Sequence, residues 1–316
     1  MEQLITGIHH ITALASGAQS NINFYCGVLG LRLVKKTVNF DAPDVYHFYY
    51  GDETGSPGSI LTFFPYEGLA RGRHGKGMLN TTSFSLPSSS LDYWMARLKK
   101  FGVDFKGPDE RFEEVILYFE DPDGLGLELV FSGKETRNGF SYGPVPVEHA
   151  IRGFYGAEIW EEGYERTAGL LTEQMDHKLI GEKGNRFRFA ATDRPGNYVD
   201  LFCAPDSLKG LGGAGTVHHI AFATPTAESQ LEARKKIAQR MLNPTPVLDR
   251  NYFTSIYFRE PGGVLFEIAT AGPGFLVDEE KDKLGTALKL PSQYEPYRAQ
   301  IEKRVVPITI NTDNFK

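Results

Sequence analysis

One order of elements recurs about four times along the chain, and this repetition constrains the fold more than any other feature of the sequence. In the first copy, apolar and polar residues alternate over residues 5–14, which predicts a strand. Apolar residues at helical spacing follow over residues 19–29 and stop at Gly30, which predicts an amphipathic helix. Three more predicted strands complete the copy, over residues 31–40, 45–50 and 59–64.

The other three copies keep the order of one strand, one helix and three strands. The second opens at Met78 and has a predicted helix over residues 89–101. The third opens at Arg152 and is the least regular, and the fourth opens at Thr216 with a helix over residues 227–240. The closing strands of these copies follow turns that contain proline and glycine, and they span residues 125–131, 198–203 and 264–270. The sequence therefore predicts an α+β protein of four βαβββ units.

Turn residues also suggest how the units are grouped. Residues 143–147, Gly-Pro-Val-Pro-Val, read as a linker between two halves. We therefore predict an N-terminal domain over residues 1–143 and a C-terminal domain over residues 148–272, with two units each. Residues 273–316 form a charged tail, in which residues 293–304 are expected to be a short helix and residues 281–289 a solvated stretch.

Two histidine pairs stand at the same place in units one and four. His9-His10 lies in the first strand of unit one, and His218-His219 lies in the first strand of unit four. Because side chains alternate along a strand, His10 and His219 share their faces with smaller or polar residues, whereas His218 falls among bulky residues that suit packing against a helix. We therefore predict that His10 and His219 are ligands, although a β-bulge would let His9 or His218 reach the same site.

One carboxylate, that of Glu267, interrupts the apolar closing strand of unit four. A buried, ionised carboxylate without a partner costs several kcal/mol at least, so Glu267 must be protonated, paired or bound to a metal. Two imidazoles and one carboxylate are the ligand set that holds a divalent iron while leaving positions open for dioxygen and substrate. A closed zinc site would need a cysteine or a fourth ligand, and neither stands at a matching position.

Glu128 offers a competing arrangement, because it takes the same place in unit two that Glu267 takes in unit four. If units one and two shared a barrel, His10 would face Glu128 alone, since Asn80-Thr81 stands where unit two would need its histidine. Pairing of units one and four gives three ligands instead of two. We therefore expect the metal site between units one and four, and we expect Glu128 to pair with an arginine or face solvent.

The remaining histidines do not fit a metal site. His47 alternates within a predicted strand and is expected to pack or form hydrogen bonds. His74 lies in a glycine-rich basic loop that lacks the ending and the context of a nucleotide site, and it is interpreted as part of a mobile loop near the mouth of a cleft. His149 and His177 are expected at the surface.

Composition excludes several classes of partner. A formal net charge of −6 without a long basic run argues against nucleic acid. No run approaches the roughly 18 apolar residues of a membrane span, and the first residues lack the features of a signal peptide. The 2 cysteines imply no disulfide framework. We therefore expect a cytoplasmic protein without membrane partners.

The order of elements over roughly residues 5–272 resembles the vicinal oxygen chelate superfamily, which includes glyoxalases, bleomycin resistance proteins and extradiol dioxygenases. This resemblance implies that the four units pair into two cupped, mixed β-barrel modules that hold a metal on their concave side. Exposed barrel edges in this architecture commonly meet, so a homo-oligomer is expected by analogy.

More local motifs resemble the hydroquinone-type ring-cleaving dioxygenases of that superfamily. These motifs are Gly7-Ile8-His9-His10-Ile11-Thr12, residues 38–49, Val217-His218-His219, Arg250-Asn251-Tyr252-Phe253, and residues 261–267. The resemblance implies an extradiol-type enzyme in which Fe(II), or Mn(II) or another divalent metal in its place, binds His10, His219 and Glu267. It implies supporting catalytic roles for His9, Thr12, His218, Arg250 and Tyr257. The expected partners are a small aromatic substrate and O2.

Two other functions remain open from the sequence. One is a glyoxalase-like, metal-dependent isomerase or lyase, although the chain is one protein ligand short of the four that glyoxalase I normally has. The other is a metal-free protein that sequesters an aromatic compound or drug, as some relatives of the superfamily do.

Overall fold

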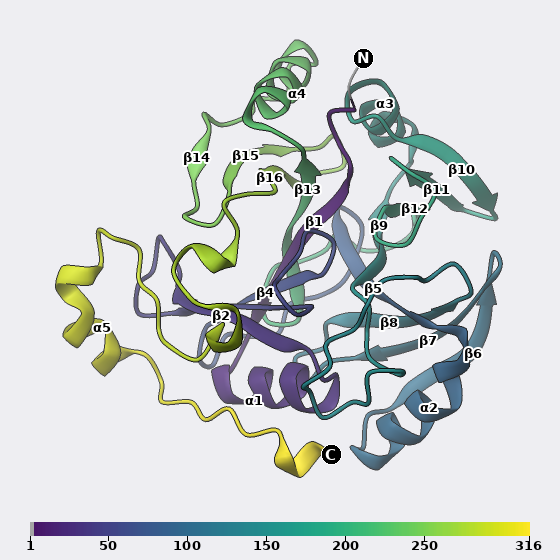
Figure 1. The fold of residues 1–316 in the computed structure, drawn as a ribbon. Helices are drawn as coiled ribbons and strands as arrows, with labels where there is room; N and C mark the ends of the chain where they lie inside the picture. Colours follow the sequence, from purple (N-terminus) through teal and green to yellow (C-terminus); the bar gives the residue numbers. More distant parts are fainter. Residues whose placement is uncertain (1–2) are drawn as a thin grey trace.

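The computed structural model describes residues 3–316, and its strands form two curled mixed sheets of eight strands each (Figure 1). All four units show the predicted order of one strand, a helix and three strands. This architecture confirms the predicted pair of cupped β modules.

The four units occupy successive parts of the chain. Unit one consists of β1 (Gly7–Ala15), α1 (Ala18–Ile22), the helical turn η1 (Asn23–Val28), β2 (Arg32–Val38), β3 (Tyr46–Gly51) and β4 (Ile60–Pro65). Unit two consists of β5 (Met78–Pro87), α2 (Leu91–Lys100), β6 (Phe105–Arg111), β7 (Glu114–Glu120) and β8 (Gly126–Ser132). Unit three consists of β9 (Phe154–Glu161), α3 (Glu165–Gln174), β10 (Lys178–Lys183), β11 (Arg186–Ala190) and β12 (Tyr198–Cys203). Unit four consists of β13 (Thr216–Thr224), α4 (Ala227–Gln239), β14 (Leu248–Asp249), β15 (Thr254–Arg259) and β16 (Leu265–Thr270).

Each sheet joins two units that begin side by side. The first sheet has the order β14-β15-β16-β13-β1-β4-β3-β2, so units one and four meet where β1 and β13 pair antiparallel. The second sheet has the order β10-β11-β12-β9-β5-β8-β7-β6, so units two and three meet between β9 and β5. Each sheet therefore combines strands from both sides of residues 143–147.

Burial along the strands follows their place in the sheet. The central strands β1 and β5 are buried at nearly every position, whereas the edge strand β10 is exposed at most of its positions. A central strand packs against helices on one face and encloses the cup on the other, so both of its faces must suit a buried environment. Polar side chains in β1 therefore need partners inside the protein.

Two β-bulges interrupt the pairing of β1 with β13, and each falls on the first histidine of a pair. The register passes from Ile8 to His10 without His9, and opposite Thr12 and Ala13 it passes from His219 to Val217 without His218. A bulge adds one residue to a strand and redirects the side chains beside it. Simple alternation, which places His218 against a helix, is therefore wrong at this position, because His218 is exposed and lines a cavity.

The C-terminal tail packs against the first sheet instead of forming a loose extension (Figure 1). Its short helix is α5 (Arg298–Arg304), inside the predicted range. The prediction of a solvated stretch over residues 281–289 is wrong at Leu284, which is buried in a cluster with Val34 and Tyr49. Backbone pairing between Lys36 and Lys289 fixes the same stretch on β2. Its apolar residues, spaced among charges, supply the contact.

Among the described residues, no helix combines the length and the apolar character that a membrane crossing requires.

Candidate metal centre

The side chains of His10, His219 and Glu267 converge inside the first sheet. The His10 Nε2 atom lies 3.2 Å from His219 Nε2 and 3.3 Å from Glu267 Oε2. His219 Nε2 lies 3.0 Å from the same carboxylate oxygen. All three residues are buried, and they come from β1, β13 and β16, which are neighbours in the sheet. The pairing of units one and four therefore brings together three residues that the chain keeps far apart.

The hydrogen bonds of His9 determine which nitrogen of His10 carries a proton. His9 Nε2 lies 3.1 Å from the Thr270 carbonyl oxygen, which can only accept, so this nitrogen donates. Burial, followed by the charge of His10, lowers the pKa of His9 to about 3, so His9 is neutral near pH 7 and its Nδ1 is an acceptor. His10 Nδ1, 2.9 Å away, therefore donates to it. A neutral His10 then presents a bare Nε2 lone pair to His219 and Glu267.

His218 contacts His219 in the way that His9 contacts His10. Their Nδ1 atoms are 2.8 Å apart, and burial lowers the pKa of His218 to about 4, so the neutral His218 can accept a hydrogen bond from His219 Nδ1–H. In that tautomer His219 also presents a bare Nε2. Both bulged histidines thus hold a neighbouring imidazole by its Nδ1–H, as partners of metal-bound histidines commonly do.

Glu267 completes a set of three acceptors without a donor. Its Oε1 accepts a hydrogen bond from Ser255 Oγ, but its fully buried Oε2 has no hydrogen-bond partner among the described residues. Burial alone would raise the pKa of Glu267; protonated imidazoles at His10 and His219 oppose this effect and hold that pKa well below its ordinary value. When both imidazoles instead present bare Nε2 atoms, no donor faces the Oε2 atom of the carboxylate. An ionised oxygen and two imidazole lone pairs facing one point require a cation between them.

The spacing and chemistry of these atoms fit a divalent metal. Ligand atoms that lie about 2.1 Å from one ion and at right angles to each other are about 3.0 Å apart. The observed separations of 3.0 to 3.3 Å are close to that value. No other group of three histidine, cysteine or acidic residues with this proximity occurs within residues 3–316. Two nitrogens and one oxygen on one side of an ion leave its other side open.

Replacing His9 with phenylalanine is expected to lower metal affinity about 10- to 100-fold, because His10 Nδ1–H loses its acceptor and the ring its fixed orientation. Competition with a chromogenic chelator measures this change. His9→Asn is the matched control, since its amide oxygen can replace the Nδ1 acceptor, and it should restore most of the affinity. Equal affinities of His9→Phe and the wild type would contradict this account of the tautomer.

A cavity of about 430 Å³ opens over the three converging atoms. His10, His218 and His219 form part of its wall, and aromatic and aliphatic side chains form most of the rest. The apolar wall and the few polar groups suit a small aromatic ligand. The wall residues outside the histidines are Leu14, Asn39, Phe40, Asp41, His47, Tyr49, Phe64, Tyr66, Thr245, Leu248, Arg250, Phe253, Tyr257 and Leu265.

Arg250 and Tyr257 lie together in this wall. Arg250 Nε donates to the Tyr257 hydroxyl over 3.1 Å, and the Tyr257 ring lies 5.8 Å from the ring of His219. Phe253, to which the sequence assigned no role of its own, has its ring 5.0 Å from the rings of both His9 and His10. The tight turn between β14 and β15 thus brings a cation and an apolar ring to the centre, and β15 brings a phenol.

Thr12 and His47 belong to a hydrogen-bonded chain beside the centre. Thr12 Oγ1 lies 2.8 Å from Thr62 Oγ1, which also lies 2.9 Å from His47 Nε2, and Tyr49 donates to His47 Nδ1 over 2.9 Å. Both ring nitrogens of His47 are engaged, so its predicted role in hydrogen bonding is confirmed. Thr12 pairs with His219 across β1 and β13, but among the hydrogen bonds of residues 3–316 its hydroxyl bonds to Thr62 and not to the three converging side chains.

The other histidines lie away from the centre. His74 bonds to the Gly215 carbonyl over 2.9 Å and is absent from the cavity wall, and backbone pairing ties its loop to residues 208–214. His149 is half-buried and stacks on Tyr93. The prediction that His177 lies at the surface is wrong, because it is buried and its Nδ1 donates to the Met175 carbonyl over 2.6 Å.

The second sheet keeps the carboxylate of the site but not its imidazoles. Glu267 pairs with Ala221 and Tyr257, and Glu128 pairs in the same way with Ser83 and Tyr118. In this correspondence, Thr81 takes the place of His219, and Gly156 takes that of His10.

In the second sheet an arginine, and not a pair of imidazoles, faces the carboxylate of Glu128. Arg111 precedes Tyr118 by as many residues as Arg250 precedes Tyr257, and its Nη2 pairs directly with Glu128, as predicted for that carboxylate. Its Nη1 also lies 3.3 Å from Glu158. A guanidinium thus neutralises the second carboxylate, and an imidazole-based site is absent there.

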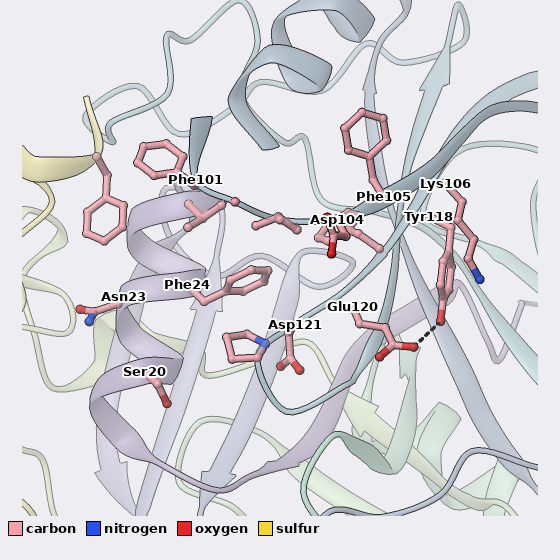
Figure 2. A pocket seen from close by; sticks show the side chains of 16 residues that line it. Ser20, Asn23, Phe24, Phe101, Asp104, Phe105, Lys106, Tyr118, Glu120 and Asp121 are labelled. Carbon is pink, nitrogen blue, oxygen red and sulfur yellow. Dashed lines mark hydrogen bonds between the residues drawn. The ribbon is translucent and has the colours of Figure 1, made fainter. Parts of the chain in front are cut away.

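A larger cavity, of about 660 Å³, lies elsewhere, between η1, the end of α2 and strands β6 and β7 (Figure 2). Its wall contains rings such as Phe24, Phe101 and Phe105, with the carboxylates of Asp104, Glu120 and Asp121. Burial raises the pKa of Asp121 to about 6, and this carboxylate is already bonded to Tyr25, Asp123 and Leu125. The lining contains no histidine, so size does not identify the chemical site here.

Comparisons with known proteins agree with this geometry. Residues 7–129 and 158–268 match the family model described as the Glyoxalase/Bleomycin resistance protein/Dioxygenase superfamily. MhqO of Bacillus subtilis (strain 168), named provisionally as a ring-cleaving dioxygenase, is 46% identical over 98% of this chain and 99% of its own. The chlorohydroquinone/hydroquinone 1,2-dioxygenase of Sphingobium indicum is 34% identical over 95% of this chain and 96% of its own.

Solved structures give the same picture. A crystal structure from Bacillus subtilis subsp. subtilis str. 168, described provisionally as a dioxygenase, has a TM-score of 0.94 and 45% identity over 98% of this chain and 99% of its own. Glyoxalase I from Zea mays has a TM-score of 0.62 at 15% identity over 84% of this chain and 92% of its own, a likeness of fold alone.

Proposed function

The chain belongs to the glyoxalase/bleomycin resistance protein/dioxygenase superfamily, and from this premise we propose that it is a ring-cleaving dioxygenase that opens a hydroquinone or a related phenolic ring with O2. The observation that supports the proposal most is the donor-free carboxylate oxygen of Glu267 facing two imidazole nitrogens under an apolar cavity. The name of the Sphingobium indicum relative supports hydroquinones as the substrate class.

In this proposal His10, His219 and Glu267 hold Fe(II), with Mn(II) or another divalent ion as a substitute. A bound divalent iron supplies redox chemistry with O2 and acidifies a phenol that binds beside it. The protein ligands lie on one side, so substrate and O2 can approach from the cavity. Their set, two neutral imidazoles and one carboxylate, leaves one positive charge uncompensated, which favours a phenolate over a neutral phenol.

His218 is proposed to hold a bound phenolate oxygen by a hydrogen bond from its Nε2–H. It lines the cavity, it is neutral near pH 7 because burial lowers its pKa to about 4, and its Nδ1 accepts from His219, so its proton is on Nε2. His9 has both nitrogens engaged and is proposed to orient His10 instead. Thr12 is proposed to keep β1 in place through Thr62.

Arg250 and Tyr257 are proposed to stabilise negative charge that develops on the substrate. The guanidinium is always charged, and the hydrogen bond to Tyr257 fixes its direction before substrate arrives. The phenol of Tyr257 can in turn donate its proton toward the cavity. Donors that are fixed in a mostly apolar site stabilise charge far better than mobile water does.

Replacing Tyr257 with phenylalanine is expected to lower kcat about 100-fold, because one fixed donor is lost while the ring stays in place. Metal content should not change, since Tyr257 is not among the three converging residues. Steady-state oxygen uptake and metal analysis of the same samples measure both quantities. A variant with full kcat would exclude the proposed role of this hydroxyl.

The proposed function is tested by oxygen-electrode assays of anaerobically iron-loaded protein against a panel of hydroquinones and catechols. Stoichiometric O2 uptake with a hydroquinone, and a ring-opened product that carries both atoms of labelled O2, are expected. Turnover of a thiol adduct without O2 would instead indicate an isomerase of the same superfamily. Tight binding of aromatic compounds to protein that takes up no metal would indicate a sequestering protein.

A further inference from the structure

One part of the cavity wall is a sandwich of three side chains, those of Phe40, Arg250 and Tyr257. The Arg250 guanidinium lies over the Phe40 ring at 5.6 Å and over the Tyr257 ring at 5.1 Å. Tyr257 is fixed within β15, but Phe40 and Arg250 lie on connecting segments. The loop of unit one that carries Phe40 and the loop of unit four that carries Arg250 must therefore keep fixed positions relative to each other for this cation to face the cavity.

The tail holds the loop that carries Arg250. Gly274 N donates to the Tyr252 carbonyl over 2.8 Å, and the Tyr252 hydroxyl donates to Asp278 Oδ2 over 3.1 Å. Within the loop, Arg250 N donates to the Phe253 carbonyl over 2.9 Å and Tyr252 N donates to the Arg250 carbonyl over 2.7 Å. Asp278 therefore contacts the residue that donates the second of these bonds and that adjoins the acceptor of the first.

Lys35 anchors this part of the tail to the first sheet. Its Nζ is completely buried, lies 2.5 Å from Asp278 Oδ1, and also pairs with Glu279. The same ammonium lies 5.1 Å from the centre of the Tyr252 ring. A buried ammonium with two carboxylates and an aromatic ring is a fixed point, because moving any partner would leave charge unpaired in the interior.

The tail also reaches the second loop. The hydroxyl of Tyr294 donates to the backbone carbonyl of Phe40. Arg298 Nη1 donates to the Leu288 carbonyl over 3.1 Å, which keeps the intervening stretch of tail closed on itself. One continuous segment thus contacts both loops of the sandwich, one through Tyr252 and the other through Phe40.

We propose that residues 274–294 of the tail are a positioning segment for substrate binding, which sets Arg250 against Phe40 through Tyr252, Asp278 and Tyr294. This inference rests on the proposed function for its substrate, but its structural part does not need turnover or metal. Tyr252 and Tyr294 are positioning residues in this account, because they act through Arg250 and Phe40 and not on the substrate itself.

The first test measures amide hydrogen exchange in metal-free protein. Tyr252→Phe removes only the hydroxyl that reaches Asp278, and Tyr294→Phe removes only the one that reaches Phe40. Tyr252→Phe should speed exchange in peptides covering residues 248–254, and Tyr294→Phe in peptides covering residues 38–42, each by about five- to tenfold. Tyr142→Phe is the matched control, since Tyr142 is highly exposed, and it should change neither.

The second test is a double-mutant cycle read as anaerobic binding of a hydroquinone to metal-loaded protein. Tyr252→Phe should raise the Kd about five- to tenfold in the wild type with unchanged metal content. In the Arg250→Met background the same change should alter the Kd less than about twofold, because the residue it positions is gone. A structural weakening would raise the Kd equally in both backgrounds.

Unchanged exchange in both tyrosine variants would overturn the proposal, and so would equal effects of Tyr252→Phe in the two backgrounds. If wild-type protein binds none of the hydroquinones, the proposed function fails instead. The exchange experiment then still decides whether the tail holds the two loops.

Discussion

His219→Ala is expected to abolish stoichiometric metal binding and to lower turnover by about 1000-fold or more, a change of at least about 4 kcal/mol in transition-state stabilisation. The loss follows from the geometry, since Glu267 Oε2 and His10 Nε2 cannot surround an ion without the third atom. Metal analysis after gel filtration and oxygen uptake at saturating substrate measure the two losses on one sample.

The control for this variant is His149→Ala, which removes a half-buried imidazole that stacks on Tyr93 and does not line the cavity. It should keep wild-type metal content and turnover. Thermal unfolding of His219→Ala without metal should show a cooperative transition, so that loss of metal is separated from loss of fold. Full metal content in His219→Ala would refute the assignment of this ligand.

Arg111→Met is expected to lower the free energy of unfolding by about 3–5 kcal/mol, because it leaves the buried Glu128 carboxylate without its guanidinium, whereas Glu158 keeps Arg186. Arg111 pairs with Glu128 and, over 3.3 Å, with Glu158, and only a few per cent of either glutamate is exposed. Denaturant unfolding near pH 7 measures the change. The centre in the other sheet should still bind metal at low denaturant.

The deficit of Arg111→Met should grow as pH rises. Burial already raises the pKa of Glu128, and Arg111 opposes that shift, so its removal raises the pKa further. A carboxyl whose pKa is higher in the folded than in the unfolded state makes the folded protein less stable as pH rises above the unfolded-state pKa, which is about 4.3 for glutamate. The difference from wild type should thus be smallest near about pH 4 and larger at about pH 7.

Two further variants serve as controls for this test. Arg111→Met with Glu128→Gln should recover much of the lost stability, because the unpaired charge is removed together with its partner. Arg71→Met breaks an exposed pair with Glu120 and should cost at most about 1 kcal/mol. If Arg111→Met also lowered the free energy of unfolding by no more than about 1 kcal/mol, water or a rearranged arginine would have to compensate the buried charge.

The fold could be predicted from the sequence because the evidence for it is local and repeated. Each unit shows its own alternation, its own amphipathic helix and its own closing turn, so errors in one copy do not obscure the others. The convergence of His10, His219 and Glu267 followed from the equal places of the two histidine pairs. Their role as ligands, and the roles of Arg250 and Tyr257, remain predictions.

Other features depended on contacts that no local pattern records. His218 was placed on the wrong face because the bulge that turns it arises from the pairing of β13 with β1. Residues 281–289 were expected to be solvated because their few apolar residues are separated by charges, and the pairing of Lys35 with Asp278 and Glu279 depends on contacts between distant parts of the chain. Phe40 reached the cavity through a loop whose path the sequence does not specify.

The meeting of β1 with β13 also has a consequence for biosynthesis. A nascent chain exposes His10 early, but Glu267 emerges only when most of the polypeptide has left the ribosome. Until then β1 has no antiparallel neighbour from unit four, while β5 and β9 can already pair from sequence made earlier. The three side chains therefore converge only late in synthesis, after the strands at the centre of the second sheet can have paired.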